Sequence, residues 1–140
     1  MFQGEFQHGL DSKGRLILPV RIREELGTGF VITKGLDGCL YIFTKEAWKD
    51  FSERLDALPT SSGNARRLKR HFIGSSTICE TDKQGRFLIP QVLRSFAHID
   101  KEVTVLGVSD KIEIWGTEYY EAYQNGYDGS IEDIAGELVF

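Results

Sequence analysis

The sequence predicts an α+β fold, a pseudo-symmetric closed barrel built from two copies of one small unit, with peripheral helices. The segment Asp11–Pro19 returns as Asp82–Pro90 at an offset of 71, and both copies read Asp-x-x-Gly-Arg, three apolar residues and Pro. A second block, Val31–Trp48, matches Val103–Tyr120 at an offset of 72. A unit of roughly 45 residues is near the lower limit for folding alone and leaves sheet edges exposed, so we expect the two copies to interleave.

The first copy reads as strand, turn, strand, short helix and hairpin. Asp11 and Gly14 have the turn chemistry of a tight connection, and Pro19 suits the first position of a helix. We expect extended chain over 4–10, a turn over 11–14, a strand over 15–18, a helix over 20–26, and strands over 30–34 and 39–44 around a turn at 35–38.

The second copy follows the same order, and two helices connect it to the first. Trp48, Phe51, Leu55 and Leu58 have a helical period before Pro59. We expect helices over 45–58, 64–73 and 117–123, one helix from Pro90, and strands over 76–81, 86–89, 102–106 and 111–115. The chain then divides into repeat 1 (5–51), a linker with a basic helix (52–75), repeat 2 (76–123) and an acidic tail (124–140). We expect one weak helical turn in the tail, whose apolar residues are numerous enough to dock back onto the body.

Charge is distributed unevenly along the 140 residues. The formal net charge is −4, but residues 100–140 hold ten acids and two bases, whereas residues 1–99 carry a net +4. An acidic total is therefore weak evidence against a polyanionic partner. No apolar run approaches the roughly 20 residues of a membrane span and no signal peptide is evident, so we expect a cytoplasmic protein. Cys39 and Cys79 are expected to be buried thiols rather than a disulfide.

The duplicated loop is the main candidate site. Asp11 and Asp82 are expected to structure it together with Gly14 and Gly85, since Asp caps turns and a carboxylate would repel phosphate. Arg15 and Arg86 can be partners of these carboxylates and still offer planar donors to phosphate or guanine. Lys at a turn tip suits a phosphate contact. The predicted DNA-binding set is Lys13, Arg15, Arg21, Arg23, Lys83, Arg86 and Arg94.

The basic helix is a second charged feature. Its four cations surround most of a helix and cannot all meet one DNA surface, so we favour a subunit interface, with the acidic 100–140 segment of a neighbour as the complement. These cations are Arg66, Arg67, Lys69 and Arg70.

Two Asp-x-x-x-Arg motifs about 70 residues apart, each followed by three apolar residues and Pro, resemble the MraZ family. This is a bacterial transcriptional regulator family related to the AbrB and SpoVT swapped-hairpin proteins. The resemblance covers residue 1 to about Tyr123. It implies a double-split β-barrel of two AbrB-like repeats, a ring-shaped homo-oligomer associated with the nucleoid, and binding to short tandem repeats in promoter DNA. It further implies autoregulation, usually repression, of the division and cell-wall gene cluster that the protein's own gene leads.

Three function classes compete. A sequence-specific DNA-binding regulator explains the duplicated basic loop and the charge asymmetry. An AbrB-like antitoxin, which also binds a protein partner, is the alternative; it would need a long arm able to wrap that partner. An enzyme is not expected, because no nucleophile–base pair or phosphate loop stands out and His8, His71 and His98 lack ligand spacing. We therefore expect no catalytic residues, metal, cofactor, membrane or small-molecule substrate.

Overall fold

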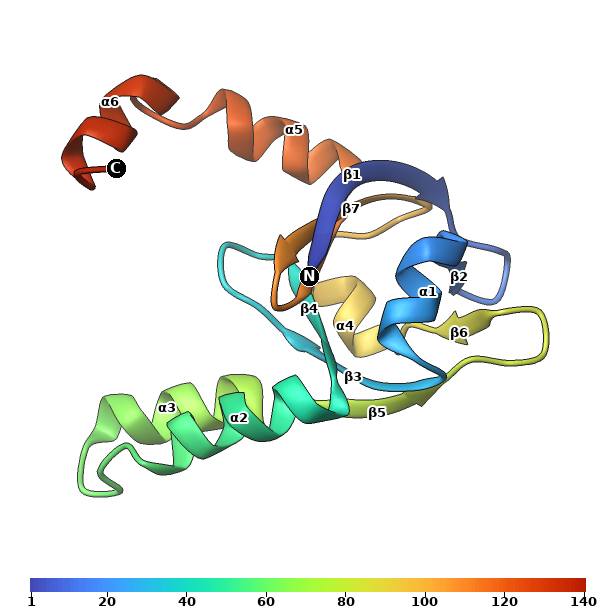
Figure 1. Ribbon diagram of the computed structural model, residues 1–140, viewed down its shortest axis with the longest axis horizontal. Helices are drawn as coiled ribbons and strands as arrows, with labels where there is room; N and C mark the ends of the chain where they lie inside the picture. The colour runs from blue at the N-terminus through green and yellow to red at the C-terminus, as the bar shows by residue number, and fades with distance from the viewer.

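The computed structural model describes all residues 1–140 and confirms an α+β fold (Figure 1). Repeat 1 and the helices after it form β1 (Phe2–Gly9), β2 (Arg15–Ile17), α1 (Val20–Leu26), β3 (Gly29–Lys34), β4 (Leu40–Thr44), α2 (Lys45–Asp56) and α3 (Gly63–Phe72). The rest of the chain forms β5 (Thr77–Glu80), β6 (Arg86–Leu88), α4 (Gln91–Phe96), β7 (Glu102–Ser109), β8 (Ile112–Gly116), α5 (Thr117–Asn125) and α6 (Ile131–Glu137).

The strands of the two repeats interleave. Six strands form one antiparallel sheet in the order β1-β7-β8-β4-β3-β5, and β2 and β6 form a separate two-stranded ribbon. Four pairings join one repeat to the other: β1 with β7, β3 with β5, β4 with β8, and β2 with β6. Each repeat therefore supplies pairing partners for strands of the other, as the small size of the unit predicts, and β1 and β5 form the two edges of the large sheet.

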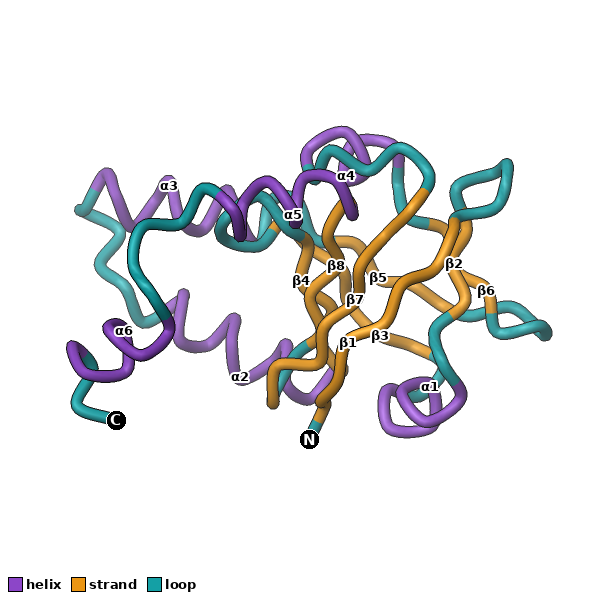
Figure 2. The backbone as a smooth tube through the Cα atoms, turned by 90° about the horizontal axis from the view of Figure 1, so that it is seen from above, coloured by secondary structure: helices purple, strands orange, loops and turns teal.

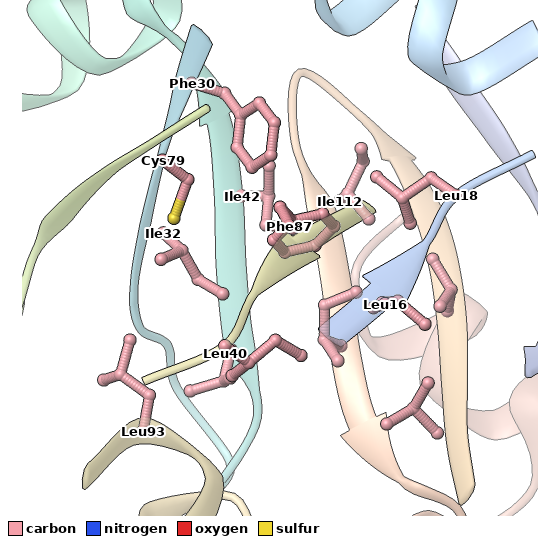
Figure 3. Close-up of a cluster of buried hydrophobic side chains, with 14 of the residues drawn as sticks. Leu16, Leu18, Phe30, Ile32, Leu40, Ile42, Cys79, Phe87, Leu93 and Ile112 are labelled. Atoms are coloured by element: carbon pink, nitrogen blue, oxygen red, sulfur yellow. The ribbon is translucent and has the colours of Figure 1, made fainter. Parts of the chain in front are cut away.

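The main core lies between the β2–β6 ribbon and the large sheet. Leu16 and Phe87 face each other in the ribbon register and are almost fully buried. Figure 3 shows both side chains pointing into a cluster with Phe30, Ile42 and other apolar residues of the large sheet. The Phe87 ring meets Phe30 edge-on at 5.0 Å between centroids. This core fixes the ribbon, and with it the position of the duplicated loops at the ribbon ends.

A second, largely aromatic cluster covers the sheet on the side of the helices. Phe43, Phe72 and Trp115 are buried in it, and Trp48, Phe51, Tyr119, Tyr120 and Tyr123 are packed against it. Trp48 and Phe51 pack from one face of α2, as their helical period predicts, and the other aromatic residues come from β4, β8, α3 and α5. The Thr44 hydroxyl caps α2 and the Ser62 hydroxyl caps α3, each by accepting a backbone N–H three residues later.

The tail differs from the expectation in two ways. Residues 131–137 form a two-turn helix, α6, whose N-terminus is capped by Ser130. The expectation that the tail docks back is wrong, because Ile131, Leu138, Val139 and Phe140 are all exposed. In Figure 2, α6 lies at the end of a segment that leads away from the sheet. Segment 126–130 contains two glycines and so gives the chain no rigid path back to the body.

The remaining predictions agree closely with the structure. Strand and helix bounds differ from the predicted ones by at most three residues, and the turn at 35–38 has left-handed backbone at Asp37 and Gly38. Cys39 and Cys79 are buried free thiols, and burial raises the pKa of the Cys79 thiol to about 11. None of the helices is both long and apolar enough to cross a bilayer.

Candidate nucleic-acid interface

Each duplicated loop is organised by its aspartate. In the first loop, Asp11 Oδ1 accepts the backbone N–H groups of Lys13 and Arg15, both at 2.9 Å, and Oδ2 accepts Arg15 Nε at 2.7 Å. Gly14 then closes the turn at φ 82°, with its N–H donated to the Asp11 carbonyl. The carboxylate thus holds both the loop backbone and the arginine side chain.

The second loop repeats this geometry. Asp82 Oδ1 accepts the N–H groups of Gln84 and Arg86 at 2.9 Å, Oδ2 accepts Arg86 Nε at 2.8 Å, and Gly85 has φ 81°. Two loops 71 residues apart therefore present an arginine in the same way.

Hydrogen bonding to the ionised form lowers the pKa of both aspartates. For Asp11 the backbone N–H of Arg15 is the largest cause, and the pKa falls to about 2. For Asp82 the shift has the same direction, with the backbone N–H of Arg86 as its main cause. Both aspartates are therefore ionised throughout the physiological range, and each arginine keeps its carboxylate partner.

Each loop is braced by an arginine from the other repeat. Arg94, from α4 of repeat 2, packs so closely on Gly14 that a Cβ at position 14 would overlap its guanidinium, and its Nη1 lies 3.4 Å from the Lys13 carbonyl. Arg23, from α1 of repeat 1, packs in the same way on Gly85 and donates its Nε to the Leu18 carbonyl at 2.8 Å. The two guanidiniums also add positive charge beside the loops.

The outer face of the β2–β6 ribbon lies between the loops. Arg15 pairs with Leu88 and Ile17 pairs with Arg86, so all four side chains share the face opposite the buried Leu16 and Phe87. Arg15, Ile17 and Arg86 line one shallow depression of about 280 Å³, and Leu88 is 53% exposed. Figures 1 and 2 both place the two loops at the same end of the molecule. Two arginines with an apolar patch between them can contact phosphates or base edges together with apolar base atoms.

The loops differ at their tips. Arg86 Nη2 donates to Gln84 Oε1 at 2.6 Å, whereas Lys13 occupies the equivalent position beside Arg15. Lys13 and Lys83 are both exposed. Arg86 therefore has fewer free hydrogen-bond donors than Arg15. In sequence, the lysine of the first loop is also one residue closer to its arginine than the lysine of the second loop.

The other predicted cations lie elsewhere. Arg21 is exposed, and its guanidinium lies at the start of β1, with Nη2 3.5 Å from the Gln3 carbonyl, rather than at a loop tip. The four cations of α3 belong to the helical end of the molecule, opposite the loops (Figure 2). None of them is in an ion pair within the chain.

Sequence reasoning missed three residues of this face. Ile17 and Leu88 reach it only through the register of the ribbon, and Gln84 through its contact with Arg86. The apolar run before each Pro indicates a strand whose side chains alternate between buried and exposed. It does not indicate which other strand pairs with it.

Fold and site together define a class: a duplicated, interleaved α+β protein that presents two aspartate-held arginine loops at one end. Comparison with protein families gives the particular family. The model described as "MraZ protein, putative antitoxin-like" matches residues 1–71 and again residues 72–137.

Curated relatives agree over nearly the full length. A protein of Desulforamulus reducens named "Transcriptional regulator MraZ" is 47% identical over 99% of this chain and 98% of its own. Proteins of the same name from Carboxydothermus hydrogenoformans and Lactiplantibacillus plantarum are 46% and 45% identical, again over 99% of this chain, and over 97% and 99% of their own. The chain belongs to the MraZ family.

Proposed function

We propose that this protein is a transcriptional regulator that binds double-stranded DNA sequence-specifically through the loops Asp11–Arg15 and Asp82–Arg86. One observation carries the proposal. Arg15 and Arg86 lie on the same face of the β2–β6 ribbon, and each is held by the aspartate of its own loop. A guanidinium held at Nε retains its Nη donors for phosphate or guanine. The names of the curated relatives support the regulatory role.

The proposed role of each loop residue follows from its position and exposure. Lys13 and Lys83 at the loop tips contact phosphates, and Arg15 and Arg86 contact phosphates or base edges. Arg23 and Arg94 hold the loops and add charge beside them. The Arg21 guanidinium lies at the start of β1, away from the loop tips, and we assign it no part in this contact.

The wider proposal follows the family. The interleaved pairing of β1 with β7, β3 with β5 and β2 with β6 supports a double-split barrel in which the AbrB-like repeats 5–51 and 76–123 imitate a dimer, with a linker over 52–75 and a tail over 124–140. The protein acts in the cytoplasm at the nucleoid, as a ring-shaped homo-oligomer on tandem promoter repeats, and represses the division and cell-wall genes that follow its own. This function requires no catalytic residue, cofactor or membrane.

The test is a fluorescence-anisotropy titration with duplex DNA from upstream of the protein's own gene and a scrambled duplex as control. We expect tight binding to the upstream duplex alone, falling steeply between about 50 and 200 mM salt because bound phosphates release counterions. Arg15→Ala and Arg86→Ala should each weaken binding, whereas Lys49→Ala on α2 should bind as the parent does. Equal binding to both duplexes would leave a nonspecific binder, and parent-like affinity of both folded arginine variants would refute the loop assignment.

A protein-interaction module of the antitoxin type is the second candidate, and one observation favours it. The tail does not pack on the body and exposes Ile131, Leu138 and Phe140. Absence of binding to any duplex at low salt, from folded protein, would make this the preferred function.

A further inference from the structure

An unpartnered amphipathic segment extends from the helical end of the molecule. This arm, residues 126–140, contains α6, and its apolar side chains Ile131, Ile134, Ala135 and Leu138 recur at i, i+3, i+4 and i+7 and so form one stripe. No residue of α6 is buried, and Ile131 and Leu138 are 77% and 74% exposed. Such a stripe is stable in water mainly when another surface covers it.

An apolar groove lies between α2, α3 and the β3–β4 turn. It has a volume of about 450 Å³, and seven of its ten lining residues are apolar, Phe51, Leu58 and Leu68 among them. Leu68 and Leu36 are 38% and 50% exposed. A groove of this kind accepts an amphipathic helix through side chains at i, i+3, i+4 and i+7.

The arm is complementary in charge to α3, which forms one wall of the groove, and the groove lining itself contains Arg54, Lys111 and Asp110. Residues 126–140 contain four acids and no base, while α3 contains four cations and no acid. None of these eight side chains is in an ion pair within the chain. Opposite charges beside matching apolar surfaces favour one partner and one orientation.

We propose that the arm of one copy docks the apolar stripe of α6 into the α2–α3 groove of a second copy. The occupant is a neighbour because α5 carries the arm outward, and α6 stands apart from α2 and α3 of its own chain (Figure 1). Arm and groove are different surfaces, so the contact is heterologous and successive copies close into a ring or extend into a filament. It lies at the end opposite the loops and leaves them free (Figure 2). The inference rests on the proposed homo-oligomer and names the contact that builds it.

The geometric test is a pairwise disulfide cross-link in the full chain. Leu138→Cys and Leu68→Cys chains carrying different tags are coexpressed, oxidised and separated without reductant. Cys39 and Cys79 are buried, so the parent supplies the background. We expect a mixed dimer from this pair and none when Glu24→Cys, at an exposed position of α1, replaces Leu68→Cys. No mixed dimer in an assembled protein would overturn the proposal. So would a link formed only within one chain that carries both cysteines, because the arm would then occupy its own groove.

The energetic test uses light scattering to measure the mass of the assembly against concentration. Because Ile131 and Leu138 are exposed in one copy, the Ile131→Asp/Leu138→Asp variant leaves the fold intact. We expect its dissociation constant to rise by at least about 30-fold, the usual loss when interface anchors are removed. Val20→Asp, also at an exposed apolar position, should assemble as the parent does. Unchanged assembly of the arm variant would overturn this inference alone. A parent that is monomeric at all concentrations would overturn the homo-oligomer as well, and neither result would touch DNA binding measured on its own.

Discussion

Replacement of Gly14 by alanine tests two effects. One is the cost of the strained backbone to stability, and the other is the loss of the contact through which Arg94 of the other repeat supports the loop. Gly14 has φ 82°, a conformation that costs a residue with a Cβ about 1 to 3 kcal/mol. The new methyl group would also overlap the Arg94 guanidinium. Because that group ends a flexible side chain, it can swing away, and we expect its displacement to add less than about 1 kcal/mol to the loss of stability. The larger effect should fall on the loop, which loses its brace.

The chain offers a matched control for this substitution. Gly27 has φ 81°, and no atom lies within 4 Å of the position its Cβ would occupy. Gly27→Ala therefore imposes a positive-φ strain without touching a loop. Urea denaturation should show a loss of stability for both variants, while the affinity for the upstream duplex should fall at least about tenfold for Gly14→Ala only, as for the loss of one good contact. Equal affinities of the two folded variants would refute the bracing argument.

Further predictions concern the core and the loop charges. Phe87→Ala should cost about 3 to 5 kcal/mol in urea denaturation, because the ring is buried, whereas Leu88→Ala, at an exposed position, should stay within about 0.5 kcal/mol. The carboxylate of Asp11 should titrate near pH 2 in an NMR titration; since its pKa is depressed in the folded state, its contribution to stability is present above about pH 4 and is lost as the pH falls toward 2. A titration of Asp11 near pH 4 in folded protein would contradict the hydrogen bonds assigned to it. Thr44→Ala should cost about 1 kcal/mol in the same denaturation assay through loss of the α2 cap, and no loss would mean that the cap is not formed.

The internal repeat carried most of the fold prediction. A tandem copy of Asp-x-x-Gly-Arg followed by an apolar run specifies a turn and a strand locally, and both occur where the pattern places them. The small size of the unit also predicted that the copies interleave. What the repeat could not specify was the pairing register, which depends on contacts such as Leu16 with Phe87 between residues 71 positions apart. The same limit concealed the places of Ile17 and Leu88 on the outer face.

The prediction that the tail packs on the body was wrong for a different reason. Its apolar content is high enough for docking, and composition alone cannot say on which molecule a surface is buried. The arginines of α1 and α4 show the same limit in another form. Their positive charge predicts that they contact DNA. The structure places Arg23 and Arg94 against the glycines of the loops of the other repeat. Only the three-dimensional arrangement gives them a structural role as well.

Under the proposed function, the presence of two unlike loops in one chain has a consequence for the DNA that the protein would bind. A homodimer presents two identical loops and therefore suits a palindrome. Here the loops differ, because Gln84 holds Arg86 while Lys13 stands beside Arg15, so the face has a direction. A directional face on copies joined head to tail through arm and groove would present the same orientation repeatedly, which suits tandem repeats rather than inverted ones. Gln84→Lys makes the second loop tip resemble the first. If this variant shifts the binding preference from a tandem toward an inverted repeat of the site, the directionality of the face originates at the loop tips. An unchanged preference would place it elsewhere on the face.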